Sequence, residues 1–309
     1  MRIQQLTGVF TPVLVLLLLV IAVAPQRAAY ARGQAGSEAI THSGIGFKQP
    51  GYLAVDTHGN VYVSDQGNNR VVELMPTGKT HVLSQAFTKN GPDHENGGPA
   101  GIAIDRLGRL YVADPVARRI VILSATGAMI GQWYRANMVP QGLALDGYGN
   151  LYVADFGADR IDKFSPKGVF QGTFGASGSG AGRFSSPSEV ALDAQGNLYV
   201  VDQQNNRVQK LSPQGKVLGV WGHGLSQPSG IAVDTHGTVY VADQGNNRIV
   251  KLSSQGQLVA AWSTKARTGL LTNVADVAVD TQGHVYVSEG SVNLIRELSS
   301  TGASLVTWQ

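Results

Sequence analysis

One phrase recurs six times along the chain, and this repetition limits the possible folds more than any other feature. In its clearest copy, residues 228–234 read PSGIAVD, residues 235–243 read THGTVYVAD and residues 244–252 read QGNNRIVKL. The Asp that ends the first part recurs as Asp56, Asp105, Asp146, Asp193, Asp234 and Asp280. The intervals range from 41 residues (Asp105 to Asp146) to 49 residues (Asp56 to Asp105). A period of this length indicates a propeller or a solenoid.

Each copy reads as four short strands. Residues 231–233 and 239–242 are apolar and rich in β-branched side chains, as expected of strands that pack on both faces. Residues 234–237 join them through an Asp and a Gly, which favours a tight hairpin. Residues 248–252 alternate in polarity and predict a third strand, and residues 256–262 predict a fourth.

A unit of four strands, repeated six times, predicts an all-β fold: a six-bladed β-propeller with four antiparallel strands per blade around a central channel. The propeller would fill residues 50–309, after a lead-in of residues 32–49. The first copy opens with an inner strand, and the chain ends one residue after the last outer strand. The ring is therefore expected to close without strand exchange. The alternative is that the lead-in supplies a strand across the seam.

Residues 1–31 have the features of an export signal. Arg2 is followed by an unbroken apolar run at residues 13–24 and by the small-x-small sequence Ala29-Tyr30-Ala31. This predicts a cleaved signal peptide and a protein that is secreted, extracellular or at the cell surface. The alternative is a retained anchor, which would bring the chain to a membrane through this segment alone.

The remaining chain is almost neutral. Residues 1–31 contain two arginines, Arg2 and Arg27, and no acid, which leaves 24 − 2 = 22 basic residues against 21 acidic ones. This balance does not favour a nucleic-acid partner, because such binding depends on an excess of positive charge. The chain has no Cys, which excludes disulfides and thiolate metal sites.

The phrase P-x-G-[IL]-A-[VIL]-D, followed by G-x-[VL]-Y-V-[AS]-D and N-x-R-[IV], resembles the NHL repeat, which also occurs in exported bacterial proteins. The likeness covers residues 50–309 and implies a β-propeller. Members of this family include protein and RNA scaffolds, sensor domains outside bacterial membranes and a peptidyl-α-hydroxyglycine α-amidating lyase, so the resemblance implies no single function.

The resemblance does not extend to the zinc site of the lyase. There the metal ligands look like a His directly after the opening Pro of a blade. The matching positions of this chain contain no His. They are Gly51, Ala100, Gln141, Ser188, Ser229 and Ala275. A zinc lyase is therefore not expected, and no metal ligand is predicted.

Two repeated features are predicted to be structural, because a ligand site rarely has the symmetry of the fold. A large aromatic residue recurs in the fourth strand, where we expect it to wedge between adjacent blades rather than form a binding platform. These residues are Trp133, Phe174, Trp221, Trp262 and Trp308, with Ser84 in the first copy.

An Asp and an Arg five residues apart are the second such feature, and a charge-assisted hydrogen bond between them would fix the turn after the second strand. The pairs are Asp65/Arg70, Asp114/Arg119, Asp155/Arg160, Asp202/Arg207 and Asp243/Arg248. The sixth copy has Glu289 and Leu294 instead, which predicts a locally different and weaker blade.

Departures from the repeat locate the candidate binding residues. The third position of the opening phrase is Gly in three copies and Tyr52, Glu189 or Asp276 in the others. These three are predicted to ring the mouth of the channel, where they could bind a divalent cation, or an amine or hydroxyl of a ligand. The alternative is that the two acids accept hydrogen bonds from nearby N–H groups.

Three long segments should share one face of the propeller: residues 85–98, 175–186 and 263–273. The first contains Asp93, His94 and Glu95, which are further candidates for ligand binding because binding residues often lie in irregular loops on a rigid scaffold. Within the second, residues 178–182 read GSGAG and predict a flexible linker.

Together these features favour a non-enzymatic, exported binding or scaffold module that presents its loop-rich face to an extracellular protein, peptide or glycan. No cofactor is required for this function. The alternative is a metal-dependent enzyme of the lyase or lactonase kind, with its site in the central channel and a divalent cation at the channel mouth.

Overall fold

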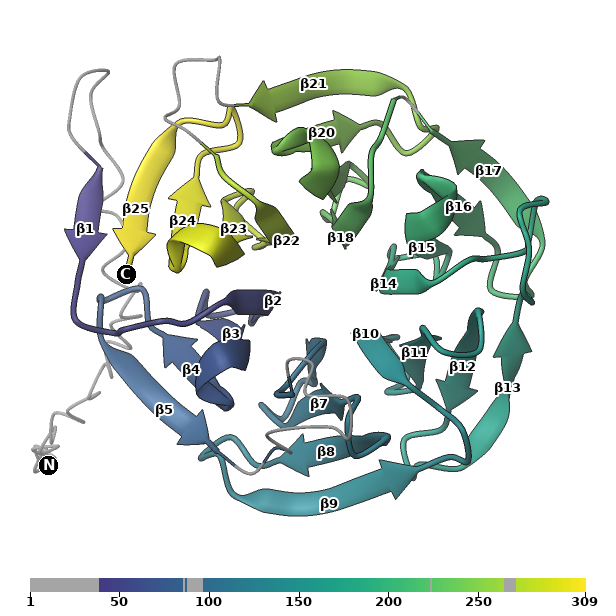
Figure 1. Cartoon of the computed structure of the whole chain (residues 1–309), viewed down its shortest axis with the longest axis horizontal. Helices are drawn as coiled ribbons and strands as arrows, with labels where there is room; N and C mark the ends of the chain where they lie inside the picture. The colour runs from purple at the N-terminus through teal and green to yellow at the C-terminus, as the bar shows by residue number, and fades with distance from the viewer. Residues whose placement is uncertain (1–38, 86, 88–96, 223, 264–270) are drawn as a thin grey trace, which may run out of the picture. The chain divides into compact units, whose positions relative to one another are not determined.

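A computed structural model describes residues 39–85, 87, 97–222, 224–263 and 271–309. In this part of the chain the regular structure consists of β-strands and four single-turn 3₁₀ helices, η2 (Gln66–Asn68), η3 (Gln203–Asn205), η4 (Gln244–Asn246) and η5 (Gly290–Val292). None of these helices is long and apolar enough to cross a bilayer. The strands form six sheets arranged as blades around a channel (Figure 1).

Each blade is one continuous stretch of chain whose strands pair in sequence order. Blade 1 contains β2 (Pro50–Val55), β3 (Val61–Asp65), β4 (Arg70–Leu74) and β5 (Thr80–Ser84). Blade 2 contains β6 (Ile102–Ile104), β7 (Leu110–Asp114), β8 (Arg119–Leu123) and β9 (Met129–Tyr134). Blade 3 contains β10 (Pro140–Leu145), β11 (Leu151–Asp155), β12 (Arg160–Phe164) and β13 (Phe170–Phe174).

The other three blades follow the same plan. Blade 4 contains β14 (Pro187–Leu192), β15 (Leu198–Asp202), β16 (Arg207–Leu211) and β17 (Val217–Trp221). Blade 5 contains β18 (Pro228–Val233), β19 (Val239–Asp243), β20 (Arg248–Leu252) and β21 (Leu258–Ser263). Blade 6 contains β22 (Val274–Val279), β23 (Val285–Glu289), β24 (Leu294–Leu298) and β25 (Ser304–Trp308). The predicted six-bladed, four-stranded propeller is confirmed.

The hydrophobic core lies between the blades. Each of its six clusters combines side chains from two neighbouring blades, such as Tyr62 and Val71 of blade 1 with Val112 and Val121 of blade 2. Every residue of the second strand in each blade is buried, for example throughout β3. This explains why these strands are apolar on both faces, since a propeller strand packs against a blade on either side.

The aromatic residue of the outer strand wedges neighbouring blades together, as predicted. Trp262 of blade 5 packs on Tyr240 of its own blade, with ring centroids 6.0 Å apart, and also reaches the turn at Gly302 of blade 6. A Cβ atom at Gly302 would lie 2.8 Å from the indole, and the backbone there has a φ of +86°. Only Gly fits this position, for reasons of both space and conformation.

The lead-in crosses the seam of the ring. Strand β1 (Ile40–His42) pairs in parallel with β25, so the sheet of blade 6 has five strands (Figure 1). The His42 ring stacks on Trp308 with centroids 5.9 Å apart, and it occupies the space above Gly78 of blade 1. The lead-in therefore does supply a strand across the seam, although the four antiparallel strands of blade 6 still come from one segment.

Deleting residues 303–309 should destabilise the protein strongly. The deletion removes β25 and the buried Trp308, and it leaves β1 without its partner strand. Loss of one buried Trp alone costs about 3 to 5 kcal/mol, out of a usual stability of about 5 to 15 kcal/mol. Urea denaturation should show this loss, whereas Leu258→Ser, on the exposed side of β21, should change little. A parental midpoint for the deletion would mean that the ring does not close at β25.

Candidate functional site

A buried acid ends the second strand of every blade. These residues are Asp65, Asp114, Asp155, Asp202, Asp243 and Glu289, all of them fully buried. In blades 1, 2, 4 and 5, one carboxylate oxygen accepts a hydrogen bond of 2.5 to 2.9 Å from the Nε–H of the Arg that begins the third strand. In blade 3 the Nη2 atom of Arg160 lies 3.2 Å from Asp155. The predicted Asp/Arg pairs are confirmed.

The same acids also hold the segments that connect the blades. Within the described residues, a carboxylate oxygen of five blades accepts a backbone N–H from the segment that leads into the blade, at 2.7 to 2.9 Å. The donors are Lys48, Val139, Ser185, Ser226 and Thr272. We call this arrangement the acid clamp. It joins the second strand, the third strand and the incoming segment at one buried charge.

Blade 6 makes the clamp with different residues. Glu289 accepts a hydrogen bond from the Nε–H of Arg296 at 2.8 Å, and its other oxygen accepts the N–H of Thr272 at 2.7 Å. Arg296 lies two residues beyond Leu294 on β24, opposite Val287. The Glu side chain is longer than that of Asp and reaches the Arg at this more distant position. The predicted local difference of blade 6 is confirmed, but the prediction that Glu289 lacks an Arg partner is wrong.

A second contact links blades 3, 4, 5 and 6 to the blade that follows each of them. In these blades the residue before the third strand has a left-handed backbone, and its side-chain oxygen accepts a backbone N–H from the segment that opens the following blade. Asn293 of blade 6 accepts in this way from Gln49 of blade 1 at 2.8 Å, which adds a polar contact at the seam. The same contact joins Asp159 to Ser186, Asn206 to Gln227 and Asn247 to Asn273.

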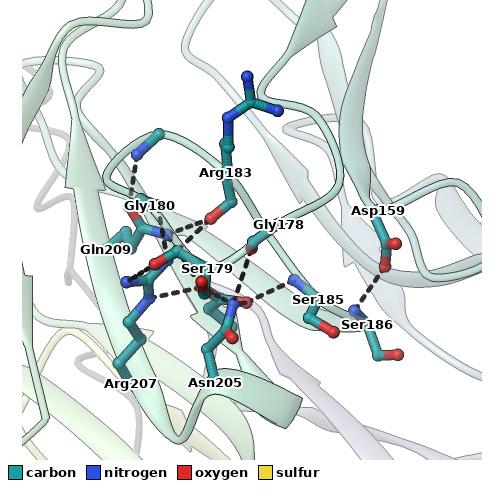
Figure 2. A network of polar contacts seen from close by, with 12 residues as sticks. Asp159, Gly178, Ser179, Gly180, Arg183, Ser185, Ser186, Asn205, Arg207 and Gln209 are labelled. Atoms are coloured by element: carbon teal, nitrogen blue, oxygen red, sulfur yellow. Dashed lines mark hydrogen bonds and ion pairs between the residues drawn. The ribbon is translucent and has the colours of Figure 1, made fainter.

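The long segment at residues 175–186 is held in place by blade 4 (Figure 2). The Arg207 guanidinium donates to three of its carbonyl oxygens at 2.7 to 2.9 Å. The Asn205 amide donates to a fourth, and the Gln209 amide donates to one that Arg207 also contacts. Four carbonyl groups take part: those of Gly178, Ser179, Gly180 and Arg183. The prediction of a flexible linker at residues 178–182 is wrong, because these hydrogen bonds define its path.

These contacts define one side of the propeller, which we call the loop face: the interblade segments together with the turns between second and third strands. Asp93, His94 and Glu95 belong to an interblade segment but lie outside the described residues, as do residues 264–270. Their role in ligand binding stays a prediction.

Glu189 and Asp276 lie inside the channel rather than around an open mouth. Glu189 is 6% exposed and Asp276 is 3% exposed. Both line a cavity of about 230 Å³ that extends along the first strands to their last residues, such as Val55 and Val233. Tyr52 is partly buried nearer the loop face, and its hydroxyl reaches from blade 1 to blade 3, where it donates to Gln141 Oε1 at 2.9 Å.

Backbone N–H groups satisfy both acids. Asp276 accepts from Leu53 of blade 1 at 2.8 Å and from Val277 at 2.7 Å, while Glu189 accepts from Val190 at 3.0 Å. These are the hydrogen bonds that the alternative interpretation of the acids predicted.

Glycines make room for these acids. A Cβ atom at Gly142 of blade 3 would collide with the Glu189 carboxylate, and one at Gly230 of blade 5 would collide with that of Asp276. The departures from the repeat are therefore paired across neighbouring blades. The sequence indicates this pairing, because each acid follows a copy of the repeat that has Gly at the same position. The contact between the acid and the Gly, however, depends on how the two blades pack.

Burial dominates the electrostatics of this site. It raises the pKa of Asp276 to about 7. Burial also raises the pKa of Glu189 well above its usual range, and the nearby charge of Asp276 adds to this effect. The pKa of Tyr52 rises for the same reason, with further contributions from both carboxylates. Across the described residues, no three His, Cys, Asp or Glu side chains are grouped so that they could hold a metal ion.

Comparison with known proteins supports the fold. A virginiamycin B lyase from Staphylococcus aureus has a TM-score of 0.63 at 16% identity, covering 83% of each chain. A gluconolactonase from Xanthomonas campestris has a TM-score of 0.58 at 17% identity, covering 79% of this chain and 85% of its own. A chain of a nidogen/laminin complex has a TM-score of 0.58 at 22% identity, covering 70% and 80%. At these identities the likeness shows the fold alone.

The sequence comparison identifies the repeat. No curated protein sequence matches the chain. The NHL repeat family matches residues 184–211 and 225–252, which contain most of the first three strands of blades 4 and 5. The other four blades have the same strand order. The NHL repeat match and the six-bladed fold together support an NHL-repeat β-propeller family for this chain.

Proposed function

We propose that this chain is an exported binding module that presents its loop face to an extracellular protein, peptide or glycan. Export rests on the signal sequence in residues 1–31, and the module needs no cofactor. One observation supports the proposal most directly: the acid clamp recurs around the ring, whereas the interblade segments that it holds vary. The acid clamp holds the incoming segment in five blades, yet these segments differ in length and sequence.

The interblade segments show this variation. Residues 135–139 and 222–227 are short, whereas residues 175–186 form a long excursion that blade 4 fixes through Arg207. In Figure 2 the Arg183 side chain points away from the hydrogen-bond network, and this residue is exposed. A surface segment that is already ordered loses little conformational entropy on binding, which favours recognition.

Charge reversal on the loop face should weaken binding. Peptides selected from a phage-displayed random library, or glycans selected on an array, would serve as ligands of the purified protein. We expect Arg183→Glu to reduce their affinity about tenfold, a change of about 1.4 kcal/mol. Lys216→Glu is the matched control, because Lys216 is exposed in the same blade at the opposite end of the strands. Ligands that respond to Lys216→Glu and not to Arg183→Glu would contradict the proposal.

We propose a second candidate function for the channel, an enzyme of the lyase or lactonase kind with a divalent cation between Glu189 and Asp276. Two buried carboxylates line the same channel cavity, and the charge of Asp276 contributes to the raised pKa of Glu189. A lyase and a gluconolactonase share the fold. Two carboxylates supply only part of a calcium coordination shell, and carbonyl oxygens or water would complete it.

The stability of the protein should depend on pH through this pair. Because the folded state raises the pKa of Asp276 from 3.8 to about 7, folded molecules keep a proton that the unfolded chain releases above pH 4. The free energy of unfolding should therefore fall between about pH 4 and pH 7, by up to about 4 kcal/mol. Chemical denaturation across this range should show the fall, and the double variant Glu189→Gln/Asp276→Asn should show a smaller one.

Adding calcium or manganese tests whether the two carboxylates bind a cation. A cation binds the ionised forms of these carboxylates, so at a pH above 7 calcium or manganese should raise the melting temperature of the parent protein and not that of the double variant. Equal melting temperatures with and without metal in both proteins would exclude the cation site. A binding function on the loop face would be unaffected by that result.

A further inference from the structure

The side of the propeller opposite the loop face contains a groove that the loop-face proposal does not use. We call this side the turn face: the turns after the first strands and those between third and fourth strands. A groove of about 450 Å³ lies here between blades 2 and 3. The corresponding groove between blades 4 and 5 measures only about 220 Å³.

A lysine crosses the smaller groove, and the described lining of the larger groove has no counterpart of it. Between blades 4 and 5, Lys210 crosses the groove and donates to the carbonyl oxygen of Ser254 at 3.2 Å, while its Nζ lies 4.8 Å from the centroid of the Tyr199 ring. The corresponding residue on β8 is Ile122, which pairs with Tyr111 in the same register. Ile122 has no amine to bridge the two blades, so the groove there stays open.

The turns on either side of the open groove have large apolar tips. Leu107 is 74% exposed and Tyr148 is 88% exposed, and both line the groove. The other four blades have polar residues at this position of the turn: His58, Gln195, His236 and Gln282. Of the six turns after the first strands, only the two that flank this groove have a large exposed apolar side chain at this position, which indicates a contact surface.

Among the described residues, the groove contains one arginine without an ion-pair partner. Arg109 forms an ion pair with Asp105, with 2.7 Å between Nε and Oδ2. The Asp146 carboxylate accepts two backbone N–H groups and the Asn150 amide. Arg106 is exposed and lines the groove, and no carboxylate of the described chain lies within ion-pair distance of it.

We propose that this groove binds a saccharide that contains a carboxylate, such as a uronic acid. Its volume lies within the range of about 300 to 1,000 Å³ that is usual for ligand sites. The Tyr148 ring and Leu107 would pack against the C–H faces of the sugar, and Arg106 would pair with its carboxylate.

The polar groups of the groove favour a sugar over an acidic peptide. Asp105 and Arg109 place acceptors and donors side by side, which suits hydroxyl groups because a hydroxyl both donates and accepts. A carboxylate side chain of a peptide would require donors alone. The site lies on the turn face and does not depend on the function proposed for the loop face.

Trigalacturonic acid is the probe, with maltotriose as a neutral saccharide and triglutamate as an acidic peptide. In calorimetric titrations we expect the parent protein to bind trigalacturonic acid and neither comparison compound. Tyr148→Ala, Arg106→Gln and Ile122→Lys should each weaken this binding about tenfold or more. Ile122→Lys introduces the bridging amine that blades 4 and 5 already contain, so it closes the groove by a contact that the fold accepts.

Two variants serve as controls and should leave the affinity unchanged: His236→Ala in the groove between blades 4 and 5, and Arg183→Glu on the loop face. Because Tyr148 is almost fully exposed, its replacement tests the site even if Ile122→Lys fails to fold. The proposal is overturned if the parent protein does not bind trigalacturonic acid, or if all three groove variants bind it as well as the parent. Binding of triglutamate alone would assign the groove to an acidic peptide. If maltotriose bound with the same affinity as trigalacturonic acid, Arg106 would not pair with a carboxylate of the saccharide.

Discussion

The propeller depends on a buried negative charge at the end of each second strand. One carboxylate there holds an Arg of the third strand and, in five blades, a backbone N–H of the segment that enters the blade. A buried charge that loses its partner costs several kcal/mol, so this arrangement strongly opposes any other path of the chain. Blade 6 shows that the constraint concerns the charge and not a fixed residue, because Glu289 and Arg296 restore the pair from different positions.

Since the anchor is the same around the ring, the function is to be sought where the blades differ. On the loop face they differ in the interblade segments, of which residues 175–186 are the longest described in full. In the channel they differ at Tyr52, Glu189 and Asp276, where acids from blades 4 and 6 occupy space left by glycines of blades 3 and 5. On the turn face they differ at Ile122, which lies beside the groove between blades 2 and 3 where blade 4 has the bridging Lys210.

The sequence predicted the structural features that recur from blade to blade and missed those that occur only once. The number of blades, their four strands, the aromatic wedges and the Asp/Arg pairs follow from a period that a single chain displays. The pairing of β1 with β25 was left open, because it joins residues more than 260 positions apart without a repeated signal. The partnership of Glu289 with Arg296 and the burial of Glu189 and Asp276 depend on side-chain length and on contacts between blades, which no local pattern contains.

The acid clamp is tested most directly by hydrogen exchange in two matched variants, Asp202→Asn and Asp243→Asn. Each removes one buried charge and leaves the size of the side chain nearly unchanged. Asp202→Asn should speed amide exchange in residues 176–186 about tenfold or more, and Asp243→Asn should do the same in residues 222–227, each without effect on the other segment. Unchanged exchange in both segments would show that the interblade connections do not depend on the buried acids.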